Sequence, residues 1–273
     1  MDIIRIGSPI YIIYLLLSAG ILLAVYFGCR KMSEHVKITI IFVLAILNLL
    51  QHFFKFLIWP HHYNTGFNII NTAYNVCAFQ IILAPFLVRK KSGAFKEFHV
   101  YVGSVGCIGA FFYPSWFIGQ TVLQWEFLRF WTCHFLLLST SLLPILWGMV
   151  KFERKNFWKI GLWFFAMLCI ILVNDVLSIY MGLAGDAESI YETLYSLNPL
   201  GIIHPPENAE LLVKILSYIT PPIFLGAKSG VYVPILWYML PAYAAITLLA
   251  YGLGTLWERY YNRNNKQKIN QKR

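Results

Sequence analysis

Cys77 and His134 are the two residues of this chain whose types and spacing best suit covalent chemistry. Each lies roughly midway through a long apolar run. At about 1.5 Å per helical residue, Cys77 lies about 15 Å and His134 about 11 Å from the predicted external end of its run. A thiol and an imidazole at similar depth can act as a nucleophile and its general base, which predicts acyl transfer.

A second group of polar residues recurs at helical spacing inside one apolar run. It consists of Asn48, Gln51, His52 and Lys55. Their spacing of i, i+3, i+4 and i+7 places them within about 100° of arc, so we expect one polar stripe that faces the protein interior. Such a stripe indicates either a functional surface or plain interhelical hydrogen bonds, worth about 0.6 kcal/mol each.

Other runs carry polar residues as well. The sixth run places Asn174, Asp175 and Ser178 on one face. The run of Cys77 also carries Tyr74 and Gln80, and the run of His134 carries Glu126 and Arg129. If the helices are neighbours, these groups form a polar chamber that opens towards the external leaflet. Lys55 and Asp175 are then either a charge pair needed only for assembly or part of a ligand site.

The composition places the chain in a membrane. Hydrophobic residues make up 59% of the sequence and charged residues only 12%, whereas soluble domains carry about 25% charged residues. The net charge of +10 comes from residues in short loops and at the C-terminus. Charges placed in this way set topology and contact anionic lipids, so we expect membrane lipids as partners and no nucleic acid.

Seven runs are long enough to cross about 30 Å of hydrocarbon, which predicts an all-α polytopic protein with seven transmembrane helices. They cover residues 9–28, 38–59, 67–88, 98–117, 127–150, 157–181 and 233–257. Of the 22 basic residues, 17 fall on one side of this arrangement. The positive-inside rule therefore predicts an external N-terminus and a cytoplasmic C-terminus. We expect a membrane domain over 1–258 and a basic cytoplasmic tail over 259–273.

The predicted external loop 182–232 is long and acidic, and within it Ala209 to Ile219 has the spacing of an interfacial helix with a Glu210–Lys214 pair. A loop of this length suits a lid. The five cysteines show no C-x-x-C motif and no His/Cys cluster, so the sequence predicts neither a metal site nor a disulfide framework. It also contains no fingerprint of a cofactor.

The segments Asn75-Val76-Cys77-Ala78-Phe79-Gln80 and Thr132-Cys133-His134-Phe135 resemble the YwaF-like (TP0381-type) family of seven-span membrane proteins. That family is distantly similar to a eukaryotic transmembrane Cys/His acyltransferase implicated in making ether phospholipids. The family's cysteine lies in the third span and its histidine about 57 residues later in the fifth, as Cys77 and His134 do here. Phe111-Phe112-Tyr113-Pro114 resembles its aromatic-proline turn. The resemblance implies a lipid-acting enzyme.

Three functions remain open. In a membrane acyltransferase or lipid hydrolase, Cys77 attacks an acyl ester and His134 serves as the base. His52, Gln80 or Asn174 would then donate to the oxyanion, and Lys55 or Arg129 would hold a lipid phosphate; the site includes Asp175 as the partner of Lys55. A transporter or ligand-binding receptor would use the polar chamber instead. A non-catalytic assembly partner would need none of these residues individually.

Overall fold

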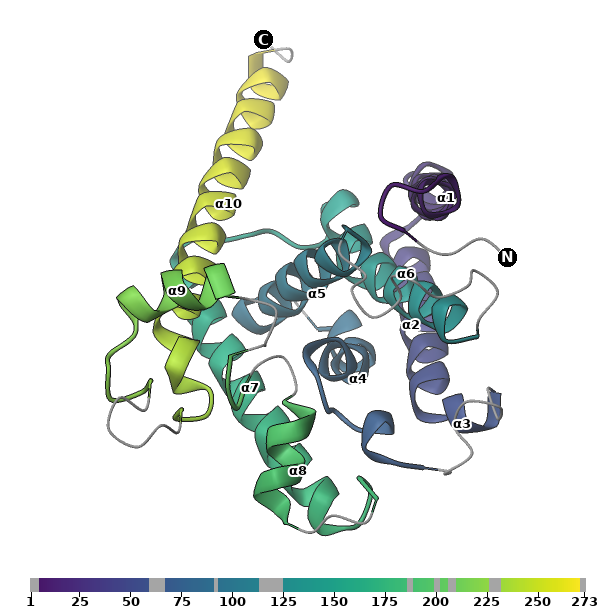
Figure 1. Cartoon of the computed structure of the whole chain (residues 1–273). Helices are drawn as coiled ribbons and strands as arrows, with labels where there is room; N and C mark the ends of the chain where they lie inside the picture. The colour runs from purple at the N-terminus through teal and green to yellow at the C-terminus, as the bar shows by residue number, and fades with distance from the viewer. Residues whose placement is uncertain are drawn as a thin grey trace. The chain divides into compact units, whose positions relative to one another are not determined.

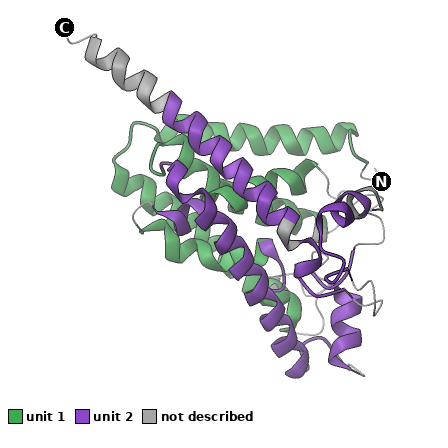
Figure 2. Ribbon diagram, turned by 90° about the vertical axis from the view of Figure 1, so that its left-hand side faces the viewer, with its two compact units in different colours: residues 1–72, 77–91, 99–150 green, residues 73–76, 92–98, 151–273 purple. Residues whose placement is uncertain are grey.

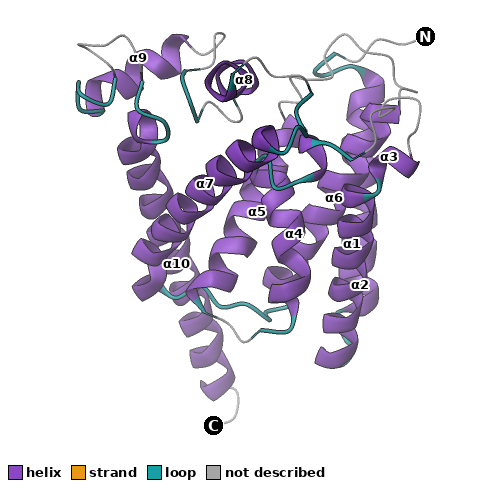
Figure 3. Ribbon diagram, turned by 90° about the horizontal axis from the view of Figure 1, so that it is seen from below, coloured by secondary structure: helices purple, strands orange, loops and turns teal. Residues whose placement is uncertain are grey.

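A computed structural model describes residues 5–58, 67–90, 93–112, 125–185, 189–198, 202–205, 210–225 and 232–270. Within these ranges the chain forms helices and loops without a strand (Figure 3). The prediction of an all-α protein is therefore confirmed for the part that the structure describes.

Among the described residues, five helical segments are long and apolar enough to cross a membrane: Pro9–Cys29, Glu34–Phe53, Ile69–Val88, Phe127–Leu146 and Arg154–Tyr180. They coincide with the predicted first, second, third, fifth and sixth spans. The fourth and seventh predicted spans are helical too, as α5 (Ala94–Phe112) and α10 (Leu236–Asn270), but they are not among the five. The crossing of the membrane by α5 and α10 and the direction of the termini stay predictions.

The chain divides into two compact units (Figure 2). Unit 1 comprises residues 1–72, 77–91 and 99–150, and unit 2 comprises residues 73–76, 92–98 and 151–273. The first residue of α4 and the first turn of α5 belong to unit 2, whereas the remainder of both helices belongs to unit 1.

The described residues of unit 1 form seven helical elements, which Figure 1 labels apart from the short η1. They are α1 (Pro9–Cys29), α2 (Glu34–Phe53), α3 (Lys55–Ile58), η1 (Ile69–Asn71), most of α4 (Val76–Val88) and α6 (Trp125–Leu146), together with most of α5. Local signals explain several ends. Pro9 starts α1 at a position that needs no backbone donor, and Ser33 accepts a hydrogen bond from Val36 N at the start of α2. Gly148, with φ of +70°, ends the turn after α6.

The core of unit 1 is aromatic. The ring of Trp131 on α6 stacks on Phe111 of α5, with centroids 4.6 Å apart, and on Tyr14 of α1 at 5.3 Å. The Tyr11 hydroxyl donates a hydrogen bond to the Phe111 carbonyl. Because ring contacts of this kind stabilise beyond their buried area, they fix α1, α5 and α6 against one another.

Two of the apolar runs in unit 1 are not continuous helices, which corrects the sequence-based picture. The second run breaks at Phe54, where α2 ends and the short α3 begins. The third run consists of the 3-10 turn η1, an extended Thr72, and then α4 from Val76. Tyr74 therefore precedes the helix that carries Cys77 and does not share a helical face with it. Neither break occurs at a proline or glycine, so the sequence contains no helix-breaking residue that would have predicted it.

Unit 2 contains η3 (Arg154–Asn156), α7 (Phe157–Tyr180), α8 (Ile190–Leu197), α9 (Glu210–Ile219) and α10. α7 and α10 pack side by side where a glycine allows a close approach. A Cβ atom on Gly161 of α7 would lie 2.5 Å from the ring of Tyr243 and 2.7 Å from the Thr247 hydroxyl. The Tyr243 hydroxyl also donates to Trp158 O at 3.3 Å.

The predicted external loop contains two short helices, α8 and α9. The helix expected over Ala209 to Ile219 is present as α9, and the side chain of Glu210 lies outside the described part of the chain. Asn198 ends α8 in a left-handed conformation, with φ of 29°, and its Oδ1 accepts from the backbone N–H of Ile203 at 3.1 Å. α10 continues to Asn270, well beyond residue 258, where we expected the membrane domain to end.

Candidate functional site

The polar stripe of the second run is buried, as its spacing predicts. The exposed fraction is 2% for Asn48, 3% for His52 and 1% for Lys55. Its members bond mainly to backbone carbonyl oxygens, and they do so in two groups. The group nearer the cytoplasmic end of the predicted span joins α2 to α6, whereas the group nearer its external end joins α2 and α3 to η1.

The first group links α2 to α6. Asn48 Nδ2 donates to the carbonyl oxygen of Cys133 at 3.1 Å. Gln51 Nε2 donates to the Thr132 hydroxyl at 2.7 Å and to the carbonyl of Arg129 at 3.4 Å. Arg129 itself is half-buried on α6. These bonds fit the interhelical role that we gave as one alternative for the stripe.

The second group serves the two helix breaks. His52 Nε2 lies 3.0 Å from Thr72 O, and since a carbonyl only accepts, this ring nitrogen carries the proton. The Lys55 ammonium donates to Ile70 O. In return, Asn71 Nδ2 donates to Phe53 O at 3.1 Å. Backbone groups freed by a break must find partners in an apolar environment, and these side chains supply them.

Cys77 lies in the first turn of α4 and is half-buried. Its side chain packs against the apolar cluster of unit 1 that includes Cys107, Cys133 and Phe111. The break before α4 thus gives Cys77 a helix N-terminus that a continuous span would have lacked.

His134 is held in one tautomer by its own helix. Its Nδ1 lies 2.8 Å from Phe130 O, which accepts the hydrogen bond, so Nδ1 carries the proton of the neutral ring. Nε2 is then the basic nitrogen. The ring packs against Phe130, with centroids 4.2 Å apart, and against Phe111 at 6.3 Å. An oriented imidazole whose Nε2 makes no hydrogen bond to the described residues is suited to accept a proton.

Cys77 and His134 therefore border the same aromatic cluster of unit 1. Among the residues that the structure describes, no hydrogen bond joins the thiol to the ring. Hydrogen bonds of catalytic groups are often long before substrate binds. The assignment of these two residues as nucleophile and base stays a prediction.

Gln80 has a partner that sequence reasoning did not single out. It is fully buried on α4, and its Oε1 lies 2.6 Å from Nδ1 of His99 on α5, which donates to it. His99 stands at the start of the predicted fourth span, where we had attached no role to it. The sequence signal that could have identified His99 is a histidine at the end of an apolar run.

The remaining candidate residues lie in unit 2. Asp175 on α7 has no exposed surface, and its Oδ1 accepts from Asn174 Nδ2 at 3.1 Å. Ser178, one turn further, is also buried, so the predicted polar face of this helix is present. Lys55 and Asp175 belong to different units, and their pairing stays a prediction, as does the polar chamber built from both units.

No cluster of three or more His, Cys, Asp or Glu side chains that could hold a metal ion occurs in the described ranges. Tyr113 and Pro114, half of the expected aromatic-proline turn, lie outside those ranges. In unit 1, Cys77 in the first turn of α4 and His134 on α6 share one aromatic wall.

Comparison with known proteins adds a family. No curated protein and no solved structure matches the chain. The similarity to YwaF-like proteins stays a prediction. The model of the TMEM164 family, a family of transmembrane proteins, matches residues 7–240, which is well over half of the 273 residues. Together with its apolar helices, this match shows that the chain is a multi-pass membrane protein and belongs to the TMEM164 family.

Proposed function

We propose that this protein is a lipid-acting enzyme of the cell membrane, an acyltransferase or hydrolase that uses Cys77 as nucleophile and His134 as base. The observation that carries the proposal is the hydrogen bond from His134 Nδ1 to Phe130 O, which leaves Nε2 as the proton acceptor. The position of Cys77 in the first turn of α4, against the same cluster, supports it.

The reaction has two steps. His134 Nε2 takes the thiol proton as Sγ attacks the carbonyl carbon of an acyl ester; the ester C–O bond then breaks and the departing alkoxide takes the proton from His134. This leaves a thioester on Cys77. In the second step His134 removes a proton from an alcohol or from water, which attacks the thioester and releases the thiolate. The thiolate recovers its proton from His134. An alcohol gives transfer, and water gives hydrolysis.

Substrate binding draws on the surrounding helices. Large apolar side chains of α1 and α2 are exposed along their length, as expected for helices that face lipid. The acyl chains of a lipid can lie among them while the ester reaches the thiol. Of the groups expected to stabilise the oxyanion, His52 and Gln80 already bond to Thr72 and His99. A donor role for either requires that it exchange a partner.

A thiol-reactive, lipid-like acyl probe tests this proposal on the purified full chain in mixed detergent–lipid micelles. Wild type is compared with Cys77→Ala, Cys77→Ser and His134→Ala, and the labelled cysteine is mapped by mass spectrometry. We expect labelling at Cys77 that is lost in Cys77→Ala and collapses in His134→Ala, with thermal unfolding unchanged. The other four cysteines, Cys29, Cys107, Cys133 and Cys169, are internal controls. Labelling spread over them irrespective of His134 contradicts the proposal.

A transporter or receptor is the second candidate, and Asp175 favours it. Its Oδ2 is buried and accepts no hydrogen bond from the described residues, and an ionisable group of this kind inside a membrane often belongs to a ligand or proton pathway. The two functions differ in their tolerance of substitution. A transporter retains ligand binding in Cys77→Ser and loses it in Asp175→Asn. The enzyme loses its activity in Cys77→Ser and retains it in Asp175→Asn.

A further inference from the structure

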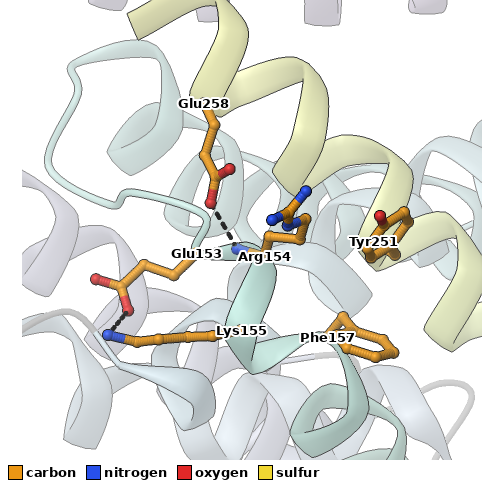
Figure 4. Close-up of a pocket in the computed structure, with 6 residues that line it drawn as sticks. All are labelled: Glu153, Arg154, Lys155, Phe157, Tyr251 and Glu258. Atoms are coloured by element: carbon orange, nitrogen blue, oxygen red, sulfur yellow. Dashed lines mark hydrogen bonds and ion pairs between the residues drawn. The ribbon is translucent and has the colours of Figure 1, made fainter. Parts of the chain in front are cut away.

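Unit 2 contains a cavity of about 480 Å³ where η3 meets α10 (Figure 4). Its volume lies within the range of about 300–1,000 Å³ that is usual for small-molecule sites. Six residues line it: Glu153, Arg154, Lys155, Phe157, Tyr251 and Glu258. None of them is a cysteine or histidine, and none belongs to the site proposed for catalysis.

The walls of the cavity are fixed before any ligand arrives. A Cβ atom on Gly254 of α10 would lie 3.2 Å from Cα of Arg154, a tight contact, so the glycine favours the close approach of α10 to η3. The backbone N–H of Arg154 donates to Glu258 Oε1 at 3.3 Å. On the other side of η3, Asn156 Nδ2 donates to Glu97 Oε1 at 2.7 Å. A preorganised site loses less free energy on binding.

The charges of the lining balance, but only half of them are paired. Lys155 Nζ lies 2.8 Å from Glu153 Oε2, which neutralises both. In the described part of the chain, no ion pair joins the Arg154 guanidinium to Glu258, which accepts from the backbone of Arg154. The guanidinium instead lies 5.8 Å from the ring centroid of Tyr251, and Figure 4 shows it between Glu258 and Tyr251. One open positive group and one open negative group thus share a wall.

The cavity also lies at the level where headgroups are expected. α7 begins at Phe157, and the predicted seventh span ends at residue 257. The lining residues therefore lie close to the ends of these two apolar segments. The rings of Phe157 and Tyr251 are 5.4 Å apart, edge to face. Aromatic rings with basic residues beside them are typical of the boundary between hydrocarbon and water.

A ligand for this cavity should carry both charges. A purely anionic headgroup is attracted by Arg154 but repelled by the carboxylate of Glu258. A purely cationic headgroup is attracted by Glu258 but repelled by Arg154. A phosphate and an ammonium joined by a short linker satisfy both, because guanidinium binds phosphate oxygens bidentately and a carboxylate accepts from an ammonium. We propose that the cavity binds the headgroup of a zwitterionic phospholipid, with the phosphate at Arg154 and the ammonium at Glu258. This lipid is bound and not consumed.

Native mass spectrometry of the purified full chain tests the proposal with two lipids of identical acyl chains. Phosphatidylethanolamine carries phosphate and ammonium, and phosphatidylglycerol carries phosphate alone. We expect wild type to retain phosphatidylethanolamine preferentially. Arg154→Gln should retain it about tenfold less, the size expected for the loss of a charge-assisted hydrogen bond. Lys159→Gln is the matched control, since this exposed basic residue of α7 does not line the cavity, and retention should stay within about twofold of wild type.

Glu258→Gln supplies a result that misfolding cannot produce. Removal of the carboxylate should raise the retention of phosphatidylglycerol to that of phosphatidylethanolamine, because the anionic headgroup no longer meets a negative group. Equal retention of the two lipids by wild type would overturn the proposal, as would an Arg154→Gln protein that retains phosphatidylethanolamine as well as Lys159→Gln does. Binding of soluble phosphoethanolamine without binding of phosphatidylethanolamine would overturn the assignment to a lipid.

Discussion

The α2–α6 pair of unit 1 and the α7–α10 pair of unit 2 are joined by different kinds of contact. Amide side chains of α2, Asn48 and Gln51, donate to backbone and hydroxyl oxygens of α6. Between α7 and α10, the absence of a side chain at Gly161 lets Tyr243 and Thr247 approach the helix backbone. Both are ways to hold helices together where apolar side chains gain little by leaving lipid.

The difference teaches how to read polar residues in a membrane protein. In unit 1, His52 and Lys55 complete the backbone hydrogen bonding at the helix breaks, and Asn48 joins α2 to α6. Burial alone therefore does not mark any of the three as functional. A functional group needs spare capacity after structural bonds are made. His134 Nε2 in unit 1 and the Arg154 and Glu258 side chains in unit 2 have that capacity.

The largest effect that we expect sharpens the comparison within unit 1. His134→Gln preserves a donor for Phe130 O but removes the base, so the rate of Cys77 acylation by the lipid-like probe should fall by about 10²–10⁴-fold, the usual contribution of a general base. Stability should change little. Asn48→Ala, which alters the same helix pair without touching the base, should acylate at nearly the wild-type rate. If both variants lose activity equally, the α2–α6 contact and not the imidazole is what matters.

Gly161→Ala tests the close contact in unit 2. Its new methyl group would overlap the Tyr243 ring at 2.5 Å, and overpacking of this kind costs about 1–3 kcal/mol. Gly252→Ala on α10 is the matched control, because its Cβ would meet nothing within 4 Å. The free energy of unfolding in mixed micelles is the measurement. Equal stability of the two variants would remove the distinction drawn between the helix pairs.

Lys55→Met tests whether the polar stripe of unit 1 is structural. The substitution retains most of the stem but leaves Ile70 O without its donor, at a cost of about 1–3 kcal/mol for a buried carbonyl. Lys37 makes the same type of bond, from Nζ to Arg30 O at 2.8 Å, in an exposed position. Lys37→Met should therefore change the unfolding free energy by less than about 0.5 kcal/mol. A similar loss in both variants would argue against burial as the cause.

The smallest effect concerns pH and belongs to unit 2. Burial raises the pKa of Glu97 above its ordinary value of 4.5, although hydrogen bonds from Asn156 and from Glu153 N oppose the shift. The folded state then binds more protons than the unfolded state between the two pKa values, so stability is highest below about 4.5 and falls as pH rises through the folded pKa. Unfolding midpoints of wild type should show this decline, and those of Glu97→Gln should be flatter. A rise in stability over the same interval would contradict the shift.

The sequence predicted the helical segments well because each long apolar run has a clear length and clear charged ends. It missed the breaks at Phe54 and at 72–75, since these are stabilised by hydrogen bonds between residues from different helices and not by proline or glycine. It identified Cys77 and His134 as candidates. It predicted neither that Cys77 lies at a helix N-terminus nor which tautomer His134 adopts. Arg154 was interpreted only as a topology signal, because its neighbour Glu258 is 104 residues away along the chain.

The length of α10 has a consequence of its own. Its 35 residues measure about 52 Å at 1.5 Å per residue. A helix tilted by about 40°, the upper end of the usual range, needs about 39 Å to cross about 30 Å of hydrocarbon. In the predicted crossing, about 13 Å of the helix therefore remains beyond the hydrocarbon, at the level of the lipid headgroups. The sequence there carries Arg263, Lys266 and Lys268, so the predicted seventh span would continue into a basic helical extension suited to anionic headgroups.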